Sequence, residues 1–286
     1  MIATDRLIYL ELQKTGCSHV RRLLKEHFNG SVTGKHNRPR NTDVTSRFVV
    51  GSIRNPWEWY VSLWAFGASG RGAVRHRTGR KVELGYYHRQ LPKAMGKNWL
   101  SISEFVTSFL HDSVKPVAKW RSTYENSEDP DQFRMWLKLI LNPVRRFDIG
   151  EGFGFSPLSQ YSGFLTYRFF RLFTVGSGVF KDTRLNTSAG LELFDKEQNV
   201  ANAIIRTENL EEDFIRAVRL AGYAPDKSVL GRIRNSARNK TNVSDRREVE
   251  HYYDEETVRL VALRDEYIIE KFGYKPPDLS RPFLKV

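Results

Sequence analysis

The stretch LIYLELQKTGCSHVRRLL, residues 7–24, places a lysine, a threonine and a glycine between an apolar run and an amphipathic segment. Residues 7–12 are rich in Leu, Ile and Tyr, which is typical of a buried strand. From Ser18 to Phe28, apolar residues recur at helical spacing, so we expect a helix there. The first backbone N–H groups of a helix bind anions readily. The turn therefore predicts a phosphate-type site, although a plain strand–helix turn with a solvated lysine has the same pattern.

Further along the chain, strand patterns continue to alternate with helix patterns. A second strand is expected at 47–53, and Pro56 is well placed to begin the helix that follows it. The sequence SISE at 101–104 has the form of a capping box and predicts a helix to about Leu110. Residues 202–210, NAIIRTENL, indicate a strand and a turn. A helix to Ala221 that Gly222 ends, and a final helix over about 254–272, complete the series.

This alternation predicts an α/β fold with a central parallel sheet flanked by helices. We find no internal repeat or linker, so the whole chain, 1–286, is expected to form one domain. Two stretches, 67–98 and 142–163, show little periodicity. They are predicted to be long loops or insertions on the substrate side of the molecule.

Composition limits the classes of function. The 286 residues carry a formal net charge of +13, which favours an anionic partner such as nucleic acid, an acidic membrane or a polyanionic glycan. Neither zinc-finger spacing nor an RNA-binding aromatic signature accompanies the charge, so nucleic acid remains a secondary hypothesis. The sequence has a single cysteine, Cys17, no long apolar run and no signal-peptide pattern. These features favour a protein of the reducing cytoplasm.

A second anion-binding pattern follows the second strand. In SIRNPWEWYVSLW, Arg54 ends the strand, and Ser62 lies about two helical turns later on the side facing Arg54. A guanidinium and a hydroxyl that converge in this way suit a terminal phosphate. The first pattern is not the nucleoside-triphosphate P-loop, because Lys14 and Thr15 precede Gly16 instead of following a glycine. A ligand with two separated phosphates would fit both sites.

These segments resemble the sulfotransferases that use 3′-phosphoadenosine 5′-phosphosulfate (PAPS), over residues 6–62 and 156–274. QKTGCSH is similar to their 5′-phosphosulfate loop and RNPWEWYVS to their 3′-phosphate motif. IIRTENLEEDF and the tail with its Tyr-Tyr pair, helix and Phe-Gly-Tyr resemble the end of the carbohydrate-type enzymes. The resemblance implies a sulfotransferase fold of the P-loop-NTPase-like kind. Gln13 stands where a proline is common, and Cys17 where Gly, Ser or Thr is usual.

The resemblance also implies roles for individual residues. Lys14 would stabilise negative charge on the bridging oxygen as the sulfuryl group leaves. Arg54 and Ser62 would bind the 3′-phosphate, and no metal is expected. Backbone or hydroxyl donors to the 5′-phosphosulfate would come from Thr15, Gly16, Cys17, Ser18 and His19. The segment SARNKTN resembles the one that folds over the 3′-phosphate and adenine, which implies Arg238, Asn239, Lys240 and Thr241.

The acceptor hydroxyl needs a base, and His36 lies between the two motifs, where glycan sulfotransferases place a catalytic histidine. A loop histidine that contacts only phosphate or solvent is the alternative. Glu11 beside the first loop, although equally suited to a structural role, is the acidic competitor. The other histidines that compete for this role are His19, His76, His88, His111 and His251.

The acceptor itself stays open among polysaccharide, glycolipid and small metabolite, and so does the oligomeric state. A basic segment at 70–81 could bind an anionic glycan or simply be solvated; it contains Arg71, Arg75, Arg77, Arg80 and Lys81. At their helical spacing, Trp57, Trp59 and Trp64 are more typical of core than of adenine stacking. A phosphotransferase that uses ATP is the alternative enzyme, but the sequence offers no convincing acidic magnesium ligand.

Overall fold

Three predicted strands form the parallel part of the sheet. The computed structural model describes residues 1–34, 41–95, 99–176, 178–236 and 247–280. In it, β2 (Leu7–Tyr9), β4 (Phe48–Ile53) and β5 (Ala203–Arg206) pair in parallel. Two short strands, β1 (Ile2–Ala3) and β3 (Ser31–Val32), complete the order β3-β1-β2-β4-β5.

The prediction of a parallel sheet was therefore wrong at one edge. β1 pairs antiparallel with both β2 and β3, so the sheet is mixed. Only residues 4–6 connect β1 to β2, and so short a connection permits a hairpin but not a parallel crossover. The Thr4 N–H donates to Leu7 O at 2.8 Å and closes this turn.

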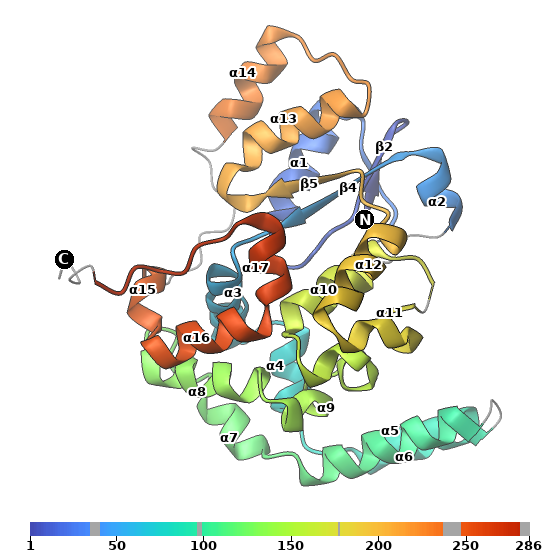
Figure 1. The fold of residues 1–286 in the computed structure, drawn as a ribbon, viewed down its shortest axis with the longest axis vertical. Coiled ribbons are helices and arrows are strands. Elements are labelled where there is room, and N and C mark those ends of the chain that lie inside the picture. Colours follow the sequence, from blue (N-terminus) through green and yellow to red (C-terminus); the bar gives the residue numbers. More distant parts are fainter. Residues whose placement is uncertain (35–40, 96–98, 177, 237–246, 281–286) are drawn as a thin grey trace.

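Helices cover both faces of the sheet (Figure 1). On one face α1 (Cys17–Phe28), α13 (Leu210–Leu220) and α14 (Lys227–Asn235) enclose a buried apolar cluster. On the other face α3 (Pro56–Ala68) and α10 (Phe164–Phe173) contribute to a larger, aromatic-rich cluster. A Cβ on Gly51 of β4 would lie 2.3 Å from the Phe173 ring, so glycine is what lets α10 approach this closely. The α/β class predicted from the sequence is confirmed.

Local signals placed several helices correctly. α1 begins at Cys17 beside the expected Ser18 and ends at Phe28 as expected, and α3 begins at Pro56. The Asn55 side chain caps α3 by accepting from the Trp57 N–H at 3.0 Å. After α13, Gly222 adopts a φ of 86°, the left-handed conformation that glycine accepts without strain.

The predicted long loop at 67–98 is largely helical instead. It contains α4 (Ala73–Thr78) and α5 (Leu84–Met95), and α6 (Trp99–Val114) follows. Tyr87 of α5 packs edge-on against Phe105 and Phe109 of α6, with ring centroids 5.5 and 5.1 Å apart. This pairing stabilises α5 through tertiary contact, which local periodicity does not reveal. Because α6 begins at Trp99, SISE lies inside the helix, and its prediction as a capping box was wrong.

Residues 142–163 are short helical turns rather than one loop. They contain η1 (Pro143–Arg145), α9 (Arg146–Ile149), η2 (Phe153–Phe155) and η3 (Pro157–Gln160). The final helix is also divided, into α16 (Glu255–Arg264) and α17 (Glu266–Phe272). The break lies at Asp265, whose buried carboxylate accepts from the Tyr60 hydroxyl at 2.6 Å and from the Thr166 N–H at 2.9 Å. These contacts with α3 and α10 fix the direction of the C-terminal helices.

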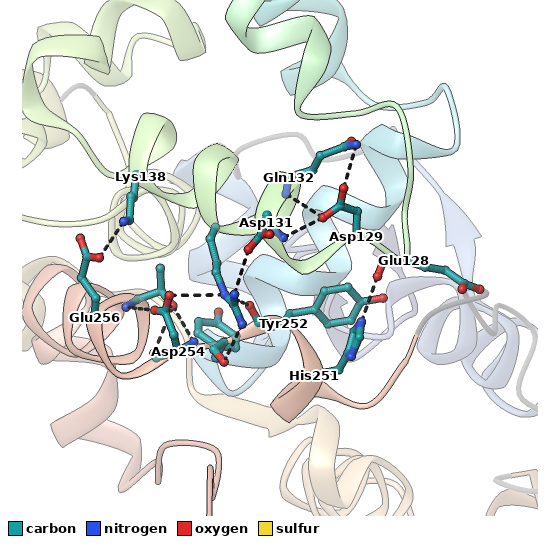
Figure 2. Close-up of polar contacts among 12 residues, drawn as sticks. Glu128, Asp129, Asp131, Gln132, Lys138, His251, Tyr252, Asp254 and Glu256 are labelled. Carbon is teal, nitrogen blue, oxygen red and sulfur yellow. Dashed lines mark hydrogen bonds and ion pairs between the residues drawn. The ribbon is translucent and has the colours of Figure 1, made fainter. Parts of the chain in front are cut away.

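The C-terminal segment also lies against α8 (Pro130–Ile140). Figure 2 shows Lys138 of α8 paired with Glu256 at 2.7 Å, and His251 of α15 (Val249–Tyr252) donating to the carbonyl of Glu128 at 2.9 Å. The remaining elements are α2 (Asn41–Ser46), α7 (Val117–Ser122), α11 (Gly178–Lys181), η4 (Thr183–Asn186), α12 (Ser188–Gln198) and η5 (Thr207–Asn209). Within the described ranges, no helix has both the length and the apolar character needed to cross a bilayer.

Candidate functional site

The two predicted anion motifs meet at the carboxyl ends of two adjacent parallel strands. The loop at 13–16 follows β2, Arg54 follows β4, and these neighbouring strands run parallel with Tyr9 opposite Val50. A direct contact joins the motifs, because the Trp59 indole N–H on α3 donates to the backbone carbonyl of Gln13 at 2.8 Å. The sequence prediction that separated motifs share one region of the molecule is thus supported by geometry.

The first loop has an unusual backbone. Lys14 adopts a φ of 70° and Gly16 a φ of 78°, both in the left-handed region. A Cβ on Gly16 would also lie 2.5 Å from Leu210 Cδ1 of α13, so glycine is required there by space as well as by φ. Lys14 is a non-glycine residue in a strained conformation, a feature that clusters at functional sites. Its Nζ lies 4.4 Å from the centre of the Phe66 ring.

Two predicted binding side chains point into the protein. The Thr15 hydroxyl lies 2.6 Å from Leu12 O and 2.5 Å from Ser52 Oγ, and the Cys17 thiol donates to Leu12 O at 2.7 Å. Burial raises the pKa of Cys17, which keeps the thiol neutral. The side chains of Thr15 and Cys17 therefore hold the loop together, and only their backbone N–H groups are suited to a ligand.

Among the residues that the structure describes, no side chain caps the N-terminus of α1. Its N-cap is Gly16, and the first turn contains no acidic residue. The His19 N–H already donates to Gly16 O at 2.9 Å, so the first backbone donors of the helix are those of Cys17 and Ser18. Ser18 is exposed, and its hydroxyl lies at the same end of the helix. This end has the character of an anion site.

The His19 ring turns toward other helices. Its Nε2 lies 3.1 Å from Glu211 of α13 and 3.0 Å from the Ser236 hydroxyl, just beyond α14. Burial lowers the pKa of His19, and the nearby Arg22 acts in the same direction, although Glu211 opposes the shift. His19 thus links α1 to the segment that precedes residues 237–246.

Arg54 is held by an acidic neighbour. Its Nε donates to Glu58 Oε2 at 3.1 Å, and its Nη2 pairs with the same oxygen. Arg54, Glu58 and Ser62 recur at four-residue spacing, so Glu58 lies between the two predicted phosphate contacts. The Ser62 side chain is buried in α3. A bound phosphate would have to compete with Glu58 for the guanidinium.

Arg168 is a site residue that the sequence analysis missed. It lies on α10, is 6% exposed, and donates through Nη1 to the Gln13 side-chain oxygen at 2.7 Å. Its other nitrogens pair with Glu151, whose second partner is Arg171 at 2.9 Å. Arg168 and Trp59 thus hold Gln13 from two sides. The available signal was an arginine next to two phenylalanines in LTYRFF, since a buried cation needs specific partners.

The candidate bases lie in different places. Glu11 is buried, accepts from Arg21 Nε at 2.8 Å and lies 2.5 Å from the Met1 amino group. Burial alone would raise its pKa, but these two cations hold the pKa below the usual range. His76 and His88 are exposed on α4 and α5. His111 stacks on Phe147 with ring centroids 4.1 Å apart.

The predicted base His36 lies outside the described residues. So do the predicted nucleotide contacts Arg238, Asn239, Lys240 and Thr241.

The basic segment at 70–81 is structured rather than a free loop. Arg71 lies over the Phe66 ring at 4.8 Å, Arg75 over Tyr124 at 5.8 Å, and Arg77 donates to Asp112 at 2.6 Å. Arg80 pairs with Glu83. Several of these cations therefore serve the fold. The tryptophans Trp57, Trp59 and Trp64 are at most 2% exposed, which confirms their prediction as core residues.

Comparison of the chain with family models, curated proteins and solved structures gives no match.

Proposed function

We propose that this protein is a sulfotransferase that uses PAPS and transfers its sulfuryl group to an acceptor hydroxyl on a glycan or small metabolite. The observation that carries the proposal is the junction of two anion-type motifs at the ends of adjacent parallel strands, joined by the Trp59–Gln13 hydrogen bond of 2.8 Å. A ligand with phosphates at both ends of a nucleoside fits such a pair. Lys14, within the first motif, has a strained backbone and supplies a cation.

Each residue has a distinct role in this proposal. The loop at 13–16 and the N-terminus of α1 would bind the 5′-phosphosulfate, while Arg54 and Ser62 would bind the 3′-phosphate. In the transfer step, a bond forms between the acceptor oxygen and sulfur as the bond from sulfur to the 5′-phosphate oxygen breaks. Lys14 stabilises the charge that develops on this leaving oxygen. The acceptor proton passes to a base, for which His36 remains the prediction; Arg238, Asn239, Lys240 and Thr241 would cover the nucleotide.

A thermal-shift series tests the proposal. Adenosine 3′,5′-bisphosphate, without added metal, should raise the melting temperature, since a ligand that binds only the folded state stabilises it. 5′-AMP should have a much smaller effect because it lacks the phosphate that Arg54 reads. Stabilisation by ATP with magnesium and not by the bisphosphate would favour a phosphotransferase instead. Stabilisation by short DNA alone would favour a nucleic-acid-binding protein.

The role of His36 has a separate test. His36→Ala should leave bisphosphate binding intact and lower turnover by about 10²-fold or more. The wild-type rate should rise with pH through an imidazole-like pKa near 6.5, and the variant should lose this limb. Weaker bisphosphate binding with the pH limb retained would make His36 a phosphate ligand. If both measurements are unchanged, the base is another residue.

A further inference from the structure

Two aromatic residues of α3 contact the first loop. The Trp59 indole N–H donates to the backbone carbonyl of Gln13 at 2.8 Å. The Lys14 ammonium nitrogen lies over the Phe66 ring, 4.4 Å from its centre, which is a cation–π contact. Trp59 and Phe66 are seven residues apart, so they lie two turns apart on the same face of α3. One face of this helix therefore contacts two successive loop residues, the first through its carbonyl and the second through its ammonium group.

The Phe66 ring is itself enclosed by the chain that follows it. Phe66 is half-buried in the last turn of α3. A Cβ on Gly72 would lie 2.9 Å from Phe66 Cδ1, so glycine is what lets the next loop approach the ring this closely. The Arg71 guanidinium carbon lies 4.8 Å from the same ring centre, and its Nε donates to the Ser69 hydroxyl at 3.1 Å. These contacts give Lys14 a fixed aromatic surface.

Such a surface suits a lysine whose charge has to be in one place. The lysine side chain is a flexible four-carbon stem, and conformational entropy opposes its ordering. An aromatic ring attracts the ammonium through its negative face. Because an ammonium carries three N–H groups, contact with one ring face does not use all of them. A cation that is positioned before the reaction stabilises developing charge without reorganisation in the transition state.

We propose that Phe66 is a positioning residue for the transfer reaction, and that its ring holds the Lys14 ammonium where the leaving oxygen becomes charged. This inference rests on the proposed sulfotransferase function and adds the last turn of α3 to the site. A ring that stacks on the acceptor is the alternative role for a half-buried phenylalanine beside the site. The two roles differ in a reaction without an acceptor, because only the first acts on the leaving oxygen.

Hydrolysis of PAPS, in which water takes the place of the acceptor, therefore tests the positioning role. Phe66→Leu keeps the apolar character and the charge but removes the ring, and it should lower kcat about tenfold with the KM for PAPS changed about twofold or less. Phe66→Tyr retains the ring and should keep most of kcat. Phe66→Met replaces the leucine variant if that variant fails to fold. An unchanged kcat in Phe66→Leu would overturn the proposal and favour an acceptor contact.

Two further variants separate positioning from a general loss of packing. In a Lys14→Ala background, Phe66→Leu should cause no further loss of kcat, because Phe66 acts through the lysine. An additional tenfold loss there would overturn the proposal. The matched control is Phe147→Leu, since Phe147 is also half-buried and lies under a cation, with the Arg146 guanidinium carbon 4.5 Å from its ring centre. This control should retain the wild-type kcat.

A spectroscopic measurement tests the contact apart from the reaction. In protein prepared with isotope-labelled lysine, the NMR signal of the Lys14 ε-methylene group is identified by its absence in Lys14→Gln. The ring current should shift this signal upfield in the wild type and in Phe66→Tyr, and Phe66→Leu should return it to the position of other lysines. An unshifted wild-type signal would overturn the placement of Lys14 by Phe66. A shifted signal in a protein that adenosine 3′,5′-bisphosphate does not stabilise would retain the contact and refute its role in transfer.

Discussion

Lys14 combines a strained backbone with a cation at the centre of the candidate site. Its φ of 70° is a conformation that costs a non-glycine L-residue about 1–2 kcal/mol. The surrounding contacts impose it: Thr15 is bonded to Leu12 and Ser52, and Gln13 is bonded to Trp59. The protein therefore accepts a local cost at this lysine. The presence of a lysine in this strained conformation is best explained by a functional role of its positive charge.

Glycine and alanine at position 14 separate these two features. Both Lys14→Gly and Lys14→Ala remove the ammonium group, so each should lower turnover by about 10²-fold or more. Only glycine relieves the strained φ, so Lys14→Gly should be more stable than Lys14→Ala by about 1 kcal/mol in urea unfolding. Equal stability of the two variants would show that the backbone conformation differs. Near-normal turnover in either variant would remove Lys14 from the mechanism.

Glu58 governs the availability of Arg54. It pairs with the guanidinium that is expected to bind the 3′-phosphate. Arg54→Ala should weaken adenosine 3′,5′-bisphosphate binding by about 10–100-fold, the value of a charge-assisted contact. Glu58→Gln removes the competing carboxylate and should tighten binding severalfold. Calorimetric titration measures both variants, with 5′-AMP as the control ligand whose affinity should change little. Weaker binding in Glu58→Gln would mean that Glu58 positions Arg54 rather than competing for it.

The contact between α10 and the first loop shows how helices distant in sequence shape the site. Arg168 reaches Gln13 across 155 residues of sequence, and Trp59 of α3 holds the carbonyl of the same residue. Together these contacts fix the residue that precedes Lys14. Where a proline would restrict the backbone covalently, this chain uses two hydrogen bonds from separate helices.

Removal of the Arg168 contact should affect catalysis more than binding. Arg168→Gln should lower kcat by about tenfold, with a smaller change in the KM for PAPS, because a displaced Lys14 mainly affects the transition state. Arg171→Gln is the matched control: it also removes a partner of Glu151 but leaves the Arg168–Gln13 bond. Gln13→Glu, which can still accept from Arg168, should retain most of kcat. Equal losses in the Arg168 and Arg171 variants would indicate a purely structural role.

For the whole molecule, histidines on α1 link stability to pH. Burial lowers the pKa of His19 and of His27; Arg22 near His19 and Arg232 near His27 act in the same direction, against Glu211 and Glu26. The unfolded chain then binds protons more readily than the native state. Stability is complete above the ordinary imidazole pKa of about 6.5 and falls as the pH decreases through it.

Urea unfolding at several pH values between about 7.5 and 5 measures this dependence. The free energy of unfolding should decrease toward acid in the wild type. His19→Gln with His27→Gln should flatten that decrease, while His76→Gln, at an exposed histidine of α4, should leave it unchanged. A decrease of the same steepness in the double variant would assign the acid sensitivity to other groups.

The sequence alone predicted the units that local chemistry specifies. Apolar periodicity, Pro56 and the glycine of the first loop placed β2, α1, β4 and α3, and the succession of strand and helix predicted the α/β class. The same signals placed the two anion motifs at the carboxyl ends of two strands, which parallel pairing brings side by side. Each of these features depends on residues close together in the chain, so periodicity and turn chemistry report them.

Tertiary structure decided what depends on distant partners. The helices α5 and α6 in place of a loop and the break at Asp265 follow from contacts across elements. So does the Arg168–Gln13 contact, which determines how the first loop is held. The physical reason is that burial and hydrogen bonding select among conformations that local sequence leaves nearly equal in free energy.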